Sequence, residues 1–175
     1  LLLAGRSKDR QRVAAAVLLN LPGMPLITYG DEVGLVEGRG RMRFGGDELM
    51  LEHYRKYLRI RNGNPGLRGQ SQDHPGGANN SYLRISSDND LNANQIFSFL
   101  RYGRGQTFVV LANRGQAPVI GTPVQYYLSA EALAAFPDGP LVMTNHAQAS
   151  DVLTVSKSQL MNGHTARVSS HEVKV

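Results

Sequence analysis

A single short apolar run, Pro25-Leu26-Ile27-Thr28-Tyr29, lies between two helical segments in the first third of the chain. Pro22-Gly23 precedes the run and Gly30-Asp31-Glu32 follows it, so turn residues bound it on both sides. Such a run is typical of a strand buried on both faces, as in parallel sheets. Because one strand cannot form a parallel sheet by itself, residues 1–62 are predicted to be a slice of something larger.

The two flanking helices are predicted from capping residues and apolar spacing. Ser7 can cap a helix from Lys8 to Asn20, and residues 13–19 are apolar on every side, which predicts burial from several directions. Asp47 can cap a second helix that ends near Asn62 and carries one apolar stripe. Gly63 suits a left-handed C-terminal cap.

The pattern changes after Leu67, where short strand candidates separated by turns follow a polar, Gly-rich stretch. This pattern of short strands and turns predicts an antiparallel sandwich or barrel, with one short helix at Ser129–Phe136. The strand candidates are Ser81–Ile85, Gln95–Tyr102, Thr107–Asn113, Val152–Val155, Thr165–Val168 and Glu172–Val175.

Composition excludes several classes of protein. The chain of 175 residues has no Cys, which rules out disulfide scaffolds, thiolate metal sites and a Cys nucleophile. It leaves the compartment open, with an extracellular or periplasmic location favoured over a cytoplasmic one. No apolar run reaches the roughly 18 residues of a spanning helix, so no membrane partner is expected. The start Leu1-Leu2-Leu3, without Met, predicts a processed or truncated chain.

The net charge of +5 resides entirely in residues 1–70. The basic runs are short and acidic residues interrupt or flank them, so a solvated helical face is favoured over a nucleic-acid partner. The five His residues show no paired spacing, and neither a metal nor a cofactor is predicted.

Residues 17–34 contain Leu-Pro-Gly-Met-Pro, an apolar strand and Tyr-Gly-Asp-Glu-Val-Gly. This stretch resembles the seventh helix and eighth strand of the catalytic barrel in the α-amylase family, glycoside hydrolase family 13. Residues 54–69 resemble its last barrel helix. Residues 96–113 and 171–175 resemble the first hairpin and the closing strand of its C-terminal β domain.

The resemblance implies a mixed fold in two parts. Residues 1–68 would be the C-terminal end of a (β/α)8 catalytic barrel, namely helix 7, strand 8 and helix 8. Residues 69–175 would be an antiparallel β-sandwich domain. The missing N-terminal portion of the barrel, or another chain, is then expected to pack against residues 1–62.

The same resemblance implies a retaining hydrolase or transglycosylase that acts on α-glucans or α-glucosides. The family's catalytic carboxylates belong to strands that come before Leu1, so no catalytic residue is assigned here and this segment alone is predicted to be inactive. Asp31 and Glu32 do not replace them, because adjacent residues leaving a strand point to opposite sides and cannot both flank one glycosidic bond.

Residues at the C-terminal ends of barrel strands line the active-site face. Tyr29, Asp31, Glu32 and Arg41 would therefore form a substrate-side loop. The structural alternative is that Asp31 and Glu32 accept backbone N–H groups or pair with Arg41 or Arg43. Phe44 replaces an expected Trp, and the loop from Val33 to Arg41 is short, which leaves substrate preference open.

A different class of function stays open beside this one. The β domain alone can be read as a non-catalytic module that binds carbohydrate or a partner protein. The chain has no Trp, the residue whose face commonly stacks on sugars, although Tyr82, Tyr102, Tyr126 or Tyr127 could serve instead.

Overall fold

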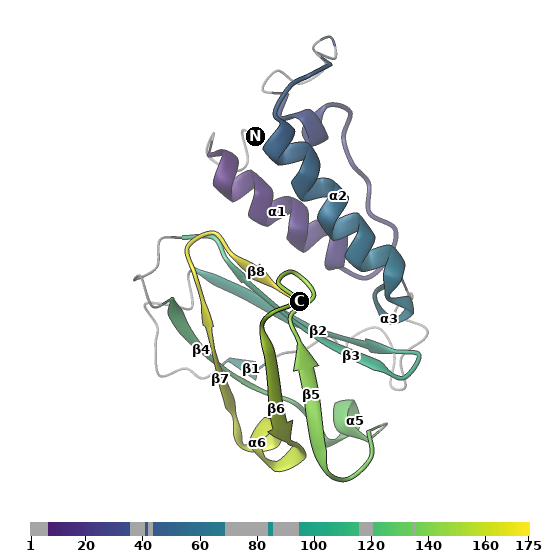
Figure 1. The fold of residues 1–175 in the computed structure, drawn as a ribbon, viewed down its shortest axis with the longest axis vertical. Helices are drawn as coiled ribbons and strands as arrows, with labels where there is room; N and C mark the ends of the chain where they lie inside the picture. Colours follow the sequence, from purple (N-terminus) through teal and green to yellow (C-terminus); the bar gives the residue numbers. More distant parts are fainter. Residues whose placement is uncertain are drawn as a thin grey trace.

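The computed structural model describes residues 7–35, 41, 44–68, 84–85, 95–115, 121–134 and 136–175. Figure 1 shows a helical end, built from the first part of the chain, above an end made of antiparallel strands. None of the helices in these residues is long and apolar enough to cross a membrane.

The helical end has the two predicted helices. Helix α1 spans Lys8–Asn20, and the Ser7 hydroxyl accepts a hydrogen bond from the Arg10 N–H. Helix α2 spans Glu48–Gly63, and Asp47 accepts one from the Met50 N–H at 3.1 Å. Both caps are thus confirmed. The prediction for Gly63 is wrong, because Gly63 is the last residue of the helix and the C-cap is Asn64, whose φ of −119° is not left-handed.

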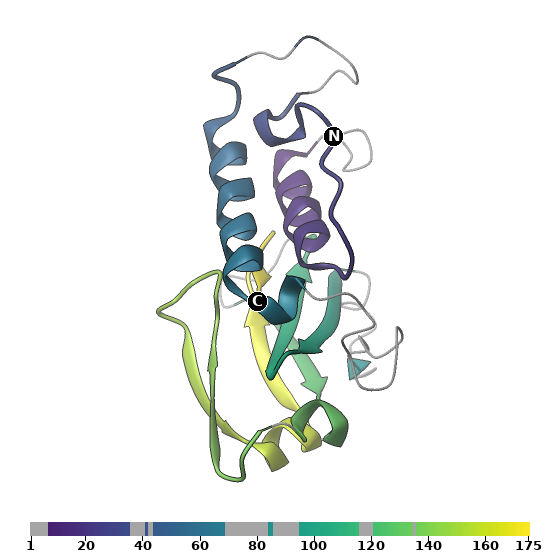
Figure 2. The ribbon, with the colours of Figure 1, turned by 90° about the vertical axis from the view of Figure 1, so that its right-hand side faces the viewer.

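The apolar run 25–29 is extended, but it pairs with no strand in the described part of the chain. Its side chains alternate, with Ile27 packed against the helices and Leu26 84% exposed. The expected strand buried on both faces is therefore wrong for this structure, and the barrel slice is not confirmed. Figure 2 shows the segment running alongside α1 with no strand beside it. An extended segment becomes a β-strand only when it pairs with another strand, and no described segment pairs with residues 25–29.

Helix α1 is less buried than the sequence predicted. Burial on every side was expected for residues 13–19, yet Ala14 is exposed, and Val17 and Leu18 are only half-buried. The buried side of the helix contacts α2, β3 and β8, while Ala14, Val17 and Leu18 lie on its other side.

The strands form three antiparallel sheets, which confirms the antiparallel prediction for the second part of the chain. One sheet has the order β2-β3-β8, with β2 at Ile96–Gly103, β3 at Gln106–Asn113 and β8 at Val173–Lys174. A second has the order β1-β4-β7, with β1 at Arg84–Ile85, β4 at Thr122–Tyr127 and β7 at His164–Val168. The third pairs β5 (Pro140–Thr144) with β6 (Val152–Ser156).

Several elements differ from the sequence-based expectation. Strands β4 and β5 were not predicted, and neither was helix α6 at Lys157–Asn162. Helix α5 is shorter than expected, at Ala130–Leu133, although Ser129 caps it as foreseen. Of the candidate Ser81–Ile85, residues 81–83 lie outside the described residues.

Two clusters of buried side chains form the core. The first joins the helices to one face of β2-β3-β8, and it includes Leu19, Met50, Tyr57, Phe99 and Val110. The second lies within the β part and includes Leu100, Leu111, Val124, Leu160 and Val168. The helices therefore use a sheet of the β part as their core surface. The division into domains at residues 68 and 69 stays a prediction.

Two buried arginines link the parts. Arg61 of α2 donates to the carbonyls of Leu19 and Leu21 at 2.7 and 2.9 Å, and also to the carbonyl of Gly23. Arg101 of β2, fully buried, donates to the carbonyl of Asn20 at 2.9 Å and to two carbonyls of α3, the short helix at Pro65–Arg68.

Candidate functional site

The predicted substrate-side residues lie where the extended segment ends and turns toward α2. A short 3-10 helix, η1, spans Asp31–Val33 and begins when the Asp31 N–H donates to the Thr28 carbonyl at 3.0 Å. The Asp47 N–H donates to the Val33 carbonyl at 3.0 Å, which ties the turn to the start of α2.

Gly30 makes this turn possible. Its φ of 86° is in the left-handed region, and a Cβ at this position would come within 2.9 Å of the Leu35 side chain. The Leu35 N–H also donates to the Gly30 carbonyl at 2.9 Å. Both backbone conformation and space therefore require glycine between the extended segment and the two carboxylates.

Asp31 and Glu32 are half-buried and consecutive in η1. The prediction that they leave a strand on opposite sides is corrected, because they belong to a helical turn. In the described part of the chain, neither side chain forms a hydrogen bond or an ion pair. The alternative in which these carboxylates accept backbone N–H groups or pair with Arg41 finds no support there, and Arg43 lies outside the described residues.

Tyr54 of α2 is the neighbour that sequence reasoning missed. Burial, and then the negative charges of Asp31 and Glu32, raise the pKa of the Tyr54 hydroxyl to about 12. The sequence placed Tyr54 only in the apolar stripe of α2. Its nearness to Asp31 and Glu32 depends on how the turn docks against α2, so no local signal in the sequence could have identified it.

Asp47 and Lys8 fix the starts of the two helices to each other. Their ion pair measures 2.7 Å. The hydrogen bond from Lys8, followed by smaller contributions from the Met50 N–H and nearby cations, lowers the pKa of Asp47 despite some desolvation. Asp47 is thus occupied as a cap and an ion-pair partner, whereas no described residue binds the carboxylate oxygens of Asp31 and Glu32.

The structure brings together Tyr29, Asp31 and Glu32 on one continuous turn but shows no contact between them and Arg41. Arg41 is exposed. Asp31 and Glu32 are consecutive in a 3-10 helix, so their side chains diverge. Each carboxylate can accept hydrogen bonds from hydroxyl groups, but the two do not face each other as the paired carboxyls of glycoside hydrolysis do. Among the described residues, no group of three or more acidic or His side chains could hold a metal ion.

The chain matches no protein-family model and no curated protein sequence. Solved structures do match. A maltogenic α-amylase, AmyB, from Thermotoga neapolitana aligns over 97% of this chain with a TM-score of 0.63 and 17% identity. A debranching enzyme from Nostoc punctiforme aligns over 97% with a TM-score of 0.61 and 17% identity.

An α-amylase from H. orenii aligns over 97% of this chain with a TM-score of 0.56 and 18% identity. The chain spans 36%, 31% and 35% of these three structures, respectively. The resemblance to the α-amylase family is therefore confirmed as a likeness of fold. The chain is similar to about one third of each of these enzymes.

Proposed function

We propose that this chain is the C-terminal part of an α-amylase-family glycoside hydrolase that acts on α-glucans or α-glucosides. The supporting observation is the structural match over 97% of the chain to enzymes whose names describe amylases and a debranching enzyme. The parent enzyme would retain anomeric configuration through a covalent glycosyl-enzyme, and its catalytic carboxylates would lie upstream of this segment.

Within that enzyme, the turn at Tyr29, Asp31 and Glu32, together with Arg41, would border the substrate. The half-buried carboxylates of Asp31 and Glu32 support this role, because no described side chain or backbone N–H group binds them. Their oxygens could accept hydrogen bonds from sugar hydroxyls. The segment itself would supply binding contacts and no catalytic group.

The missing portion of the barrel, or another chain, would cover residues 1–62. The extended segment supports this proposal, since Met24 is 95% exposed and Leu26 is 84% exposed on its outer face. Residues 25–29 are also extended, and no strand of the described part of the chain pairs with them, so a strand of another chain could lie beside them. Such a strand would bury both side chains.

Two measurements test the proposal. The purified chain is expected to release no reducing sugar from soluble starch, and the coding sequence upstream of Leu1 is expected to continue in frame and to encode an Asn-His-Asp motif. Starch hydrolysis by the chain, lost in Asp31→Asn or Glu32→Gln, would show that the catalytic groups lie within it. An upstream reading frame without the motif would contradict membership of the parent enzyme in this family.

A further inference from the structure

A cleft of about 400 Å³ lies between strands β6 and β7 in the β part of the molecule. Strand β7 lines it with four consecutive residues, 164–167, and the start of β6 lines it with three, 151–153. Consecutive residues alternate between the two faces of a strand, so a cleft that meets all of them lies along the strand edge. In Figure 1, β6 and β7 run in opposite directions with α6 between them in the chain.

The direction of the main-chain groups of β7 follows from a proline. In the β4–β7 ladder, Pro123 lies opposite Arg167, and Gln125 lies opposite Thr165. Because Pro123 has no N–H, the Pro123–Arg167 pair is a non-hydrogen-bonded pair of the ladder. Hydrogen-bonded and non-hydrogen-bonded pairs alternate in an antiparallel ladder, so the Gln125–Thr165 pair, two residues along, is also non-hydrogen-bonded. The N–H and C=O groups of Thr165 and Arg167 therefore point away from β4, toward the cleft.

The same reasoning applies to β6. Pro140 lies opposite Ser156, and Thr144 lies opposite Val152, four residues along the ladder. Two hydrogen bonds agree with this alternation: the Ser156 N–H donates to the side chain of Gln159 at 2.8 Å, outside the ladder, and the Asn145 N–H donates to the Asp151 carbonyl at 2.9 Å, within it. The main-chain groups of Val152 therefore also point away from β5, on the edge that lines the cleft.

No strand of the described part of the chain pairs with the outer edge of β6 or of β7. The hydrogen bonds of that part include none from a main-chain group of Val152, Thr165 or Arg167 outside the ladders. Two unpaired strand edges consequently border one cleft, and each presents the alternating donors and acceptors that a further strand would match.

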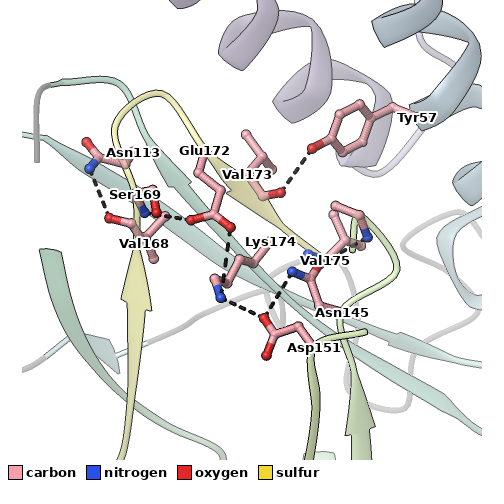
Figure 3. A network of polar contacts seen from close by, with 11 residues as sticks. Tyr57, Asn113, Asn145, Asp151, Val168, Ser169, Glu172, Val173, Lys174 and Val175 are labelled. Carbon is pink, nitrogen blue, oxygen red and sulfur yellow. Dashed lines mark hydrogen bonds and ion pairs between the residues drawn. The ribbon is translucent and has the colours of Figure 1, made fainter. Parts of the chain in front are cut away.

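Of the three charged side chains that line the cleft, Lys174 and Asp151 are paired with each other (Figure 3), and Arg167 donates to the Gly121 carbonyl at 3.4 Å. Lys174 forms an ion pair with Asp151 at 2.7 Å and a longer one with Glu172 at 3.9 Å. Asn145 donates a hydrogen bond to Asp151 at 3.2 Å. The floor is apolar and includes Val109 and Leu111. An uncharged ligand fits these surroundings better than an ionic one.

We propose that this cleft is a strand-addition site that binds an extended, uncharged polypeptide segment of a partner protein. The segment would form main-chain hydrogen bonds with Thr165 and Arg167 on one side and with Val152 on the other. A polypeptide is favoured over a sugar because only a polypeptide repeats N–H and C=O groups at the spacing of a strand edge. This inference does not depend on the proposed glycosidase origin of the chain.

The experiment uses the whole chain and the capped peptide acetyl-Val-Thr-Val-Thr-Val-amide. Amide hydrogen exchange is followed by NMR while the peptide is added. We expect exchange at Thr165, Arg167 and Val152 to slow by about tenfold at saturation, since new hydrogen bonds protect these amides. A peptide N-methylated at alternate residues, which loses the donors of one edge, should bind roughly tenfold more weakly.

A matched pair of variants separates the backbone from the side chain. Arg167→Ala keeps the main-chain N–H and should bind the peptide as the native chain does. Arg167→Pro removes an N–H that β4 does not use and should weaken binding. Equal binding of the N-methylated peptide, exchange that the peptide leaves unchanged, or protection of the same amides by maltotriose instead of the peptide would each overturn the proposal.

Discussion

Two arginines, Arg61 and Arg101, satisfy the free carbonyl groups at the C-terminal end of helix α1. The last carbonyls of α1 have no partner within the helix, and they face the interior of the molecule. Arg61 and Arg101 donate to the carbonyls of Leu19, Asn20 and Leu21. Burial and the nearby charge of Arg61 lower the pKa of Arg101 to about 10, so it remains a cation near neutral pH. Two guanidinium groups thus complete the end of α1.

His53 gives the helix pair a pH dependence. Its Nε2 atom lies 2.7 Å from the Arg12 carbonyl of α1, and its ring contacts Tyr57. Burial, with smaller contributions from Lys56 and Arg12, lowers the pKa of His53 below 6.5 in the folded state. The unfolded chain therefore binds more protons in this range. The stabilisation is complete above about pH 6.5 and is lost as the pH falls through the folded pKa.

We expect the free energy of unfolding, measured with urea, to decrease between about pH 7.5 and pH 5 in the native chain. The variant His53→Gln, which keeps a donor for the Arg12 carbonyl but does not titrate, should show a flatter dependence. Asp47 and Asp151 titrate below this window, because their pKa values are lowered from 3.8. An equal slope in the two proteins would contradict the assignment to His53.

At the scale of elements, the same chain contains two kinds of apolar segment. Helix α1 buries Leu19 completely against α2 and the β2-β3-β8 sheet, while the extended segment leaves Leu26 84% exposed. A helix satisfies its own backbone and needs neighbours only for its side chains. An extended segment needs neighbouring segments for its backbone hydrogen bonds as well as for its side chains. The absence of such neighbours therefore affects the extended segment more than the helix.

A pair of substitutions measures this difference. Leu19→Ala should lower the free energy of unfolding by about 2–5 kcal/mol, because it creates a cavity in a packed core. Leu26→Ser should change it by less than about 0.5 kcal/mol, as expected for an exposed position. Urea unfolding followed by circular dichroism, at a concentration low enough for the chain to be monomeric, checks both. A large effect of Leu26→Ser would mean that this side chain is covered in solution.

At the scale of the whole molecule, exposed apolar side chains gather on the helical end. Met24, Leu26, Tyr29, Phe44 and Leu49 are each more than half exposed. Together they form part of the surface that the proposed barrel or another chain would cover. A molecule with this much exposed apolar surface at one end is expected to associate.

We therefore expect the chain to form dimers or larger species in sedimentation velocity at tens of micromolar, and to bind a hydrophobic dye. The double variant Met24→Ser/Leu26→Ser should shift it toward the monomer. The matched variant Val142→Ser/Val152→Ser, at exposed positions of β5 and β6, should not. A native chain that stays monomeric, melts cooperatively and binds little dye would contradict the need for a partner surface.

Local signals in the sequence predicted much of the fold. The caps at Ser7, Asp47 and Ser129 depend on residues three positions apart, so they could be identified without tertiary structure. The turn residues Gly30-Asp31-Glu32 were also recognised, although their 3-10 helix was not. Strand β5 was missed because its burial alternates weakly and its partner, β6, supplies its definition.

By itself, the sequence determined the two helices, their starting residues and the antiparallel character of the second part, because capping and periodicity are local properties. The tertiary structure alone decided that residues 25–29 remain unpaired, that Arg101 is buried at the end of α1, and that Tyr54 lies near Asp31 and Glu32. Each of these outcomes depends on which distant segments meet. Strand pairing and burial depend on contacts between distant segments, and a local sequence pattern does not specify those contacts.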